Sequence, residues 1–184
     1  MQLSDTLIKI LEGIAVVFGL LFTFLYLNDI LMPKGFFFAI AGAAIFMFLC
    51  IRKEIYAESF LHLFYILTGI LGFYFYENTP VSEWDNNWHF YLIIASLLAT
   101  LFVGFLLKKN SNSKLPYIDA FTTVFSLGAT WLMITWEPTN WFYWVVINSV
   151  TVFLYYRRGL KMGALLYAIY LLMAIQGSYD VLMS

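Results

Sequence analysis

The sequence has few of the charged side chains that a soluble protein places on its surface. Only 11% of its 184 residues are charged, against about 25% in soluble domains, and 62% are hydrophobic. A water-soluble fold of this composition would lack the polar surface needed to cover its core. We therefore predict an integral membrane protein that lies in a lipid bilayer.

Several chemical features are also missing. Cys50 is the single cysteine, which excludes an intrachain disulfide, a dithiol redox motif and a cysteine cluster. The net charge is -1, so the chain lacks the basic field that binds nucleic acid. A phosphate-binding GxxxxGK loop, a metal-binding HExxH motif and paired Asp-rich magnesium motifs are absent too. We expect no catalytic residues, no cofactor, no metal and no nucleic-acid partner.

Long apolar runs account for most of the chain. A helix needs about 20 apolar residues to cross the roughly 30 Å of hydrocarbon in a bilayer. Uncharged runs of about this length predict an all-α fold of seven transmembrane helices, at residues 6–27, 35–51, 55–76, 88–107, 117–136, 139–157 and 161–182. The loops between them are short, so residues 1–184 are expected to form a single membrane domain.

The basic residues predict the orientation of these helices, because lysine and arginine in short loops stay on the cytoplasmic side. Glu12 interrupts the first apolar run, which is therefore expected to be a retained helix rather than a cleaved signal peptide. With the N-terminus inside, Lys34 is the one basic residue among ten that falls outside. An odd number of spans then places the C-terminus outside.

The sequence contains an internal repeat. With an offset of 105 residues the third and seventh predicted helices align without a gap, and so do the second and sixth. With an offset of 107 residues the first helix aligns with the fifth, and Glu12 meets Asp119. Pairs matched at the offset of 105 include Arg52 with Arg157, Tyr65 with Tyr170, and Gly72 with Gly177. Two three-helix repeats are therefore predicted, residues 6–76 and 117–182.

Two consecutive three-helix units would insert with opposite orientations, so an extra crossing is needed to give them the same one. The fourth helix, residues 88–107, is predicted to be this linker. A 3+1+3 arrangement is the parallel-repeat architecture of small transporters, which bind solutes near the membrane midplane between the repeats. Transport is therefore the first hypothesis. The alternative is a membrane structural protein or enzyme in which the polar residues only join helices.

Polar residues follow one face of the fifth predicted helix, at spacings of three and four residues. They are Asp119, Thr122 or Thr123, Ser126 and Thr130. Polar groups within an apolar span indicate either a functional site or hydrogen bonds between helices. Asp119 can equally stabilise the start of its helix. Glu12 lies about two turns inside the first helix, where a role in a pathway or between the repeats is favoured.

The sixth predicted helix carries two indoles and an amide on one face. Trp141, Trp144 and Asn148 are spaced i, i+3 and i+7. Trp141 starts the helix, so an aromatic belt at the membrane interface also explains it. Asn148 lies near the bilayer centre, where an amide needs partners, and its repeat equivalent is Ala43. Since indole faces attract flat molecules and cations, this face predicts a site for a flat cationic solute.

Other polar residues of the apolar spans give weaker signals. Glu58, in the first turn of the third helix, would add charge complementarity to the site, or else extend its carboxylate to the interface. Gln176 must hydrogen-bond either a ligand or a helix. A lone histidine such as His62 is more often a packing residue than a ligand, and His89, near the outer interface, is uninformative.

The run NWFYWVVINS at residues 140–149 resembles the Pnu family of bacterial vitamin transporters, as do Tyr117–Asp119 and the run AIQGSYDV at residues 174–181. The most specific element is WxxWxxxN, and the resemblance spans essentially the whole chain, including Glu12 and Tyr56. It implies a multi-pass protein of the bacterial inner membrane that takes up flat vitamin precursors by facilitated diffusion. An intracellular kinase would phosphorylate the solute and so retain it.

The resemblance implies that Trp141, Trp144 and Asn148 line the solute site, with Asp119 and Gln176 nearby. Family members carry nicotinamide riboside or thiamine, both aromatic cations. Nicotinamide riboside members are expected to have amide side chains in the first repeat and an asparagine near the last helix, where this chain has Gly42, His62, Gly69 and Gln176. The carboxylate of Glu58 would suit a thiazolium or aminopyrimidine, so thiamine is predicted first and nicotinamide riboside second. An oligomer stays open, since apolar faces look alike against lipid or another copy.

Overall fold

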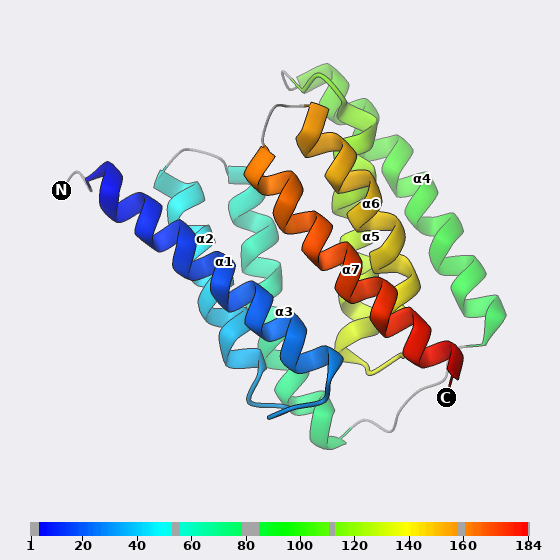
Figure 1. Ribbon diagram of the computed structural model, residues 1–184. Helices are drawn as coiled ribbons and strands as arrows, with labels where there is room; N and C mark the ends of the chain where they lie inside the picture. The colour runs from blue at the N-terminus through cyan, green and yellow to red at the C-terminus, as the bar shows by residue number, and fades with distance from the viewer. Residues whose placement is uncertain (1–3, 53–55, 79–84, 111–112, 158–160, 184) are drawn as a thin grey trace. The chain divides into compact units, whose positions relative to one another are not determined.

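The computed structural model describes residues 4–52, 56–78, 85–110, 113–157 and 161–183 (Figure 1). Within these ranges the chain forms seven helices. They are α1 (Asp5–Leu27), α2 (Phe36–Arg52), α3 (Tyr56–Asn78), α4 (Asn86–Asn110), α5 (Pro116–Ile134), α6 (Asn140–Arg157) and α7 (Lys161–Met183). The all-helical prediction is therefore confirmed, and the seven helices fall on the seven predicted runs.

Five helices are long and apolar enough to cross a membrane: α1, α3, α4, α5 and α7. The helix α2 is apolar but has 17 residues. The helix α6 has 18 residues and contains two asparagines, a serine and a threonine, which lower its hydropathy. Its polarity is the same feature that made it a candidate for the solute site.

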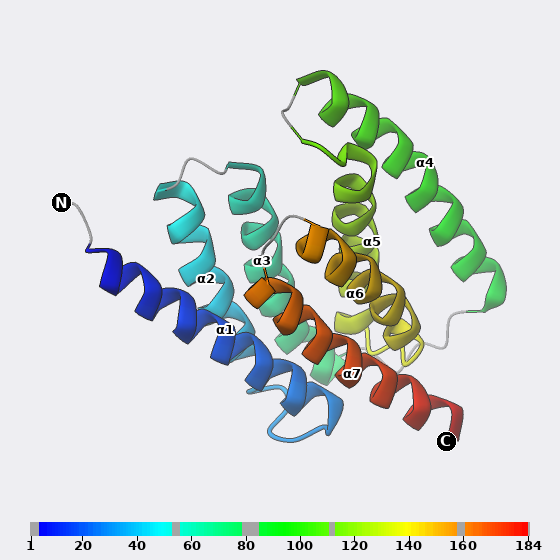
Figure 2. The same cartoon turned by 45° about the horizontal axis from the view of Figure 1, so that its top comes forward.

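The chain divides into two compact units, Met1–Pro80 and Val81–Ser184. In the first unit α2 packs against both α1 and α3. In the second unit α5 packs against α4 and α6, and α6 packs against α7 (Figure 2). Each unit therefore contains three successive helices in which the middle one contacts both neighbours, and the second unit has α4 in addition.

The helices α1 and α5 end with the same C-terminal motif. In each, a residue of positive φ follows the last turn: Asp29 (φ 49°) after α1 and Trp136 (φ 60°) after α5. The closing backbone hydrogen bonds, both 2.9 Å long, run from Ile30 N–H to the Leu25 carbonyl and from Glu137 N–H to the Leu132 carbonyl. These bonds satisfy carbonyls that would otherwise lack partners at the helix end. The two motifs are 107 residues apart, the offset at which the first and fifth helices align.

An aromatic ring at the start of α2 or α6 lies on a glycine of the following helix. A Cβ placed on Gly72 of α3 would lie 2.4 Å from a ring carbon of Phe36. A Cβ placed on Gly177 of α7 would likewise lie 2.4 Å from an indole carbon of Trp141. Only glycine leaves room for either ring, so both contacts depend on it. They are related by the offset of 105 residues.

The far ends of α2 and α6 carry a second recurring contact. The guanidinium of Arg52 lies 5.9 Å from the ring centre of Phe48, and that of Arg157 lies 5.9 Å from the ring centre of Phe153. Each is a cation–π pair one turn apart on its own helix. The sequence similarity at this offset therefore corresponds to similar side-chain contacts at both ends of α2 and α6.

Candidate functional site

The polar stripe of α5 faces the inside of the second unit. Ser126 and Thr130 are buried, and Asp119 and Thr122 are half-buried. Thr123 is exposed and lies off the stripe, so the threonine on this face is Thr122. The Thr122 hydroxyl donates to the carbonyls of Ile118 and Asp119, a local bond of the kind that satisfies a hydroxyl within an apolar helix.

Asp119 lies in the first turn of α5, which begins at Pro116. The Ser113 hydroxyl donates to Asp119 Oδ2, and the Asp119 N–H donates to the Leu115 carbonyl at 3.0 Å. A carboxylate at this position interacts favourably with the positive end of the helix dipole. These contacts account for Asp119 as a residue that stabilises the start of its helix.

Trp144 lies on the side of α6 that packs against α5. Its indole joins Phe121 and Tyr143 against a buried cluster of Phe125, Ala129 and Ile147. No hydrogen bond to the Trp144 side chain is found among the residues that the structure describes. The indole is half-buried and turned into the unit, with its N–H available as a donor.

Asn148 follows Trp144 by one turn and is 4% exposed. Within the described part of the chain its side-chain amide has no hydrogen-bond partner. Such an amide on an apolar helix is ready to bond to a ligand that supplies the missing donor or acceptor.

Two other predicted site residues have contacts elsewhere. Trp141 packs on α7 at Gly177, so its indole belongs to the contact between α6 and α7. Gln176 is exposed, and its Nε2 donates to Asp180 Oδ1 at 2.8 Å, one turn along the same helix. Gln176 was predicted to be buried in the last span, and this prediction is wrong, although its side chain does hydrogen-bond within its own helix. The structure thus places Trp144 against α5 and Trp141 against α7, and it leaves Asn148 buried on α6 and Gln176 bonded within α7.

The two predicted acids of the first unit are described unequally. Glu12 is half-buried on α1. Glu58 lies in the first turn of α3, as does Tyr56, but both side chains fall outside the part of the chain that the structure describes.

A buried polar network at one end of the second unit was missed by the sequence analysis. Glu137, in the connection between α5 and α6, is 2% exposed. The Thr139 hydroxyl donates to Glu137 Oε1 at 2.9 Å and lies 3.2 Å from His89 Nε2 on α4. His89 Nδ1 lies 2.9 Å from the Tyr143 hydroxyl on α6. These contacts join residues 50 and 54 positions apart, so no local spacing could have indicated them.

The side chains around Trp144 supply aromatic and polar groups rather than metal ligands. Among the described residues no group of three or more histidine, cysteine, aspartate or glutamate side chains is arranged to hold a metal ion. The arrangement instead combines a half-buried indole, an amide without a partner and a buried hydroxyl stripe. It can stack on a flat ring and hydrogen-bond a polar substituent.

Known proteins match nearly the whole chain. The family model described as nicotinamide mononucleotide transporter matches residues 9–181. The chain is similar to the nicotinamide riboside transporter PnuC of Escherichia coli (strain K12) and to that of Shigella flexneri. Each is 21% identical over 200 residues, covering 91% of this chain and 83% of the relative.

A solved structure has a similar fold. The crystal structure of the vitamin B3 transporter PnuC superposes with a TM-score of 0.71 at 22% identity. The match covers 91% of this chain and 78% of that one. The fold of this chain is therefore similar to that of the solved structure.

Proposed function

The chain belongs to the nicotinamide mononucleotide transporter family, the Pnu family that its sequence resembles, and from this membership we propose that it takes up nicotinamide riboside by facilitated diffusion. Membership makes it a membrane transporter rather than an enzyme. Its several apolar helices fit a multi-pass protein of the bacterial inner membrane.

The observation that carries the proposal is the pairing on α6 of Trp144, which packs against the α5 cluster, with the buried Asn148 one turn further along the helix. The indole offers a flat surface that attracts a pyridinium ring by stacking and by its quadrupole. The amide of Asn148, buried and without a partner among the described residues, would bond to the carboxamide or a ribose hydroxyl. Trp141 is proposed to support this wall from its contact with α7, and Asp119, Thr122 and Gln176 to act outside it.

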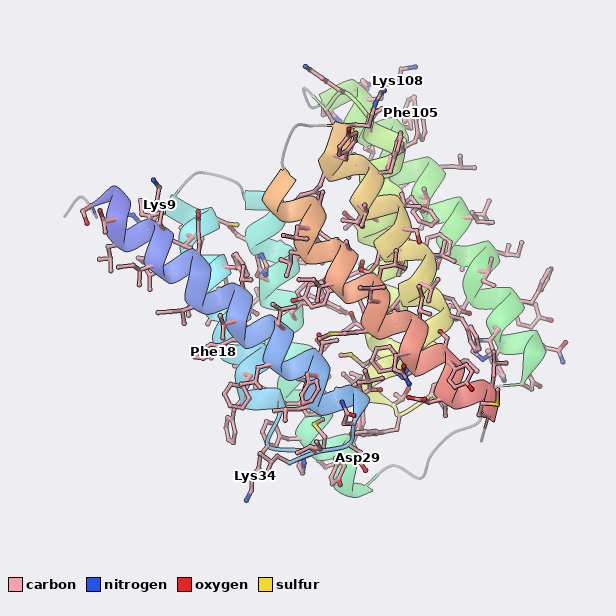
Figure 3. All side chains as sticks on the ribbon, in the orientation of Figure 1. Lys9, Phe18, Asp29, Lys34, Phe105 and Lys108 are labelled. Carbon is pink, nitrogen blue, oxygen red and sulfur yellow. The ribbon has the colours of Figure 1, made fainter. Side chains whose placement is uncertain are left out.

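The riboside is a better candidate than the nucleotide because a phosphate needs cationic partners when it leaves water. The basic side chains of the second unit that the structure describes are exposed and lie at or near helix ends (Lys108 is labelled in Figure 3). They are Lys108, Lys109, Lys114 and Arg157. The region around Trp144 therefore suits a cation without a phosphate.

Thiamine becomes the alternative solute. The sequence ranks it first because of Glu58, whose side chain lies outside the described residues. The relatives that cover 91% of the chain are nicotinamide riboside transporters. The comparisons therefore favour nicotinamide riboside over thiamine.

The proposed architecture is 3+1+3, with α1–α3 and α5–α7 as parallel repeats and α4 as the linker. The recurring helix ends and the recurring ring–glycine contacts support it. The N-terminus is proposed to lie inside and the C-terminus outside, since Lys9 and the outer Lys34 lie at opposite ends of the first unit (Figure 3). Rocking of the repeats about one site would then alternate its access.

Uptake into liposomes tests the proposal. Purified protein should equilibrate radiolabelled nicotinamide riboside across the bilayer without concentrating it, and accumulation should require an enclosed nicotinamide riboside kinase. Thiamine, tested in parallel, should enter more slowly. Liposomes without protein measure the rate at which the solute leaks across the bilayer.

Absence of protein-dependent riboside entry would overturn the proposed solute. Concentrative uptake driven by a proton gradient without the kinase would overturn facilitated diffusion while leaving the solute in place.

Asn148→Leu should weaken binding of nicotinamide riboside about fivefold, the effect of one hydrogen bond worth ~1 kcal/mol. Because the amide has no partner among the described residues, the substitution should not lower the melting temperature. Calorimetry and thermal unfolding in detergent measure the two effects.

Asn140→Leu provides the matched control. Asn140 is equally buried, but its Nδ2 donates to the Glu137 carbonyl at 2.7 Å. Its replacement should lower the melting temperature. If Asn148→Leu lowered it as much and left the affinity unchanged, Asn148 would be a structural residue.

A further inference from the structure

The hydrogen bonds of the buried network run in one direction. The ionised carboxylate of Glu137 only accepts, so the single Thr139 proton is directed to it. Thr139 Oγ1 must then accept from His89, which places a proton on Nε2. His89 Nδ1 is left as an acceptor for the Tyr143 hydroxyl. The chain therefore runs from Tyr143 through His89 and Thr139 to Glu137.

The acceptor end of this chain is held in place. Glu137 Oε1 also accepts from the Thr139 N–H at 3.3 Å, and it lies 4.0 Å from His89 Nε2. The Glu137 N–H closes the C-terminal motif of α5, and the Glu137 carbonyl accepts from Asn140 at the start of α6. A carboxylate fixed at both backbone groups can orient the imidazole.

The donor end of the chain lies in the proposed solute site. The ring of Tyr143 is 5.9 Å from that of His89, at 37°. Tyr143 and Trp144, adjacent on α6, both pack against the cluster of Phe125, Ala129 and Ile147. Any rotation of the Tyr143 ring would change the packing around the Trp144 indole, because interiors are densely packed.

We propose that His89 is a positioning residue for the solute site: from α4 it holds the Tyr143 ring and thereby the indole of Trp144. This inference rests on the proposed function. It gives α4 a role beyond joining the repeats, since this helix supplies a side chain on which the geometry of the site depends.

Calorimetry on the purified full chain tests the role of His89. His89→Leu and Tyr143→Phe should each raise the dissociation constant of nicotinamide riboside about fivefold, as expected when one hydrogen bond is lost. The double variant should also show about a fivefold increase rather than about 25-fold, because both substitutions remove the same interaction. His89→Asn, whose amide oxygen can replace Nδ1 as the acceptor, should restore most of the affinity.

Transport kinetics separate positioning from folding. The KM should rise in His89→Leu, with the maximal rate per folded protein unchanged within about twofold. Thr100→Val, on the same helix at a buried hydroxyl without a hydrogen-bond partner in the described chain, should change neither.

A multiplicative effect in the double variant, or an unchanged dissociation constant in His89→Leu, would overturn the positioning role while the wild type still bound the riboside. A loss of stability with no rescue of affinity by asparagine would overturn it as well. If the wild type bound no riboside, the proposed function itself would fail.

Discussion

Trp144→Ala is expected to weaken binding of nicotinamide riboside by ~1–3 kcal/mol, which is about 5- to 150-fold in the dissociation constant. The substitution removes the stacking surface and the attraction between the indole face and the pyridinium charge. Trp144→Phe keeps a ring and should retain part of the affinity. Calorimetry with the riboside measures each variant.

Trp88→Ala serves as the control because Trp88, on α4, is 61% exposed. It should leave the affinity unchanged. Equal affinities for wild type and Trp144→Ala would mean that Trp144 only packs against the buried cluster of the second unit, and the proposed wall of the site would be wrong.

Gly177→Ala is expected to give the largest loss of stability. The added methyl would lie 2.4 Å from an indole carbon of Trp141 and 2.7 Å from the Cγ atom, which cannot move away without a new side-chain rotamer. Forcing a group into a packed contact costs ~1–3 kcal/mol. The melting temperature in detergent should fall, and a smaller fraction of the variant should elute as a single peak in size-exclusion chromatography.

Gly13→Ala is the matched control, since no atom lies within 4 Å of its added Cβ. Alanine favours a helix by about 1 kcal/mol over glycine, so this variant should be at least as stable as the wild type. A Gly177→Ala protein as stable as Gly13→Ala would show that α6 and α7 can separate without cost.

The helices could be predicted from the sequence because lipid requires long apolar runs, and this signal does not depend on how helices pack. The end of α5 was harder to predict. The apolar run continues to Trp136, yet the helix ends at Ile134 because Trp136 adopts a positive φ. A positive φ after a helix is usually signalled by a glycine in the sequence, and here a bulky residue that seldom occupies this conformation takes that place.

The candidate site could be predicted only in part. The spacing of Trp144 and Asn148 placed them on one helix face, but spacings of three and four residues could not choose between Thr122 and Thr123. Gln176 and Asp180 are four residues apart on one helix, a spacing at which side chains can hydrogen-bond, so the sequence contains the signal for their hydrogen bond. The pairing of His89 with Tyr143 could not be predicted from the sequence, since it depends on how α4 lies against the start of α6.

The burial of Asn148 at a position where the other repeat has Ala43 has a consequence for the symmetry of the site. Both positions are buried, so the backbone of either half tolerates a small apolar residue there. In the proposed repeat architecture the solute site is therefore asymmetric, because the second half of the chain supplies a buried amide where the first half supplies only a methyl group.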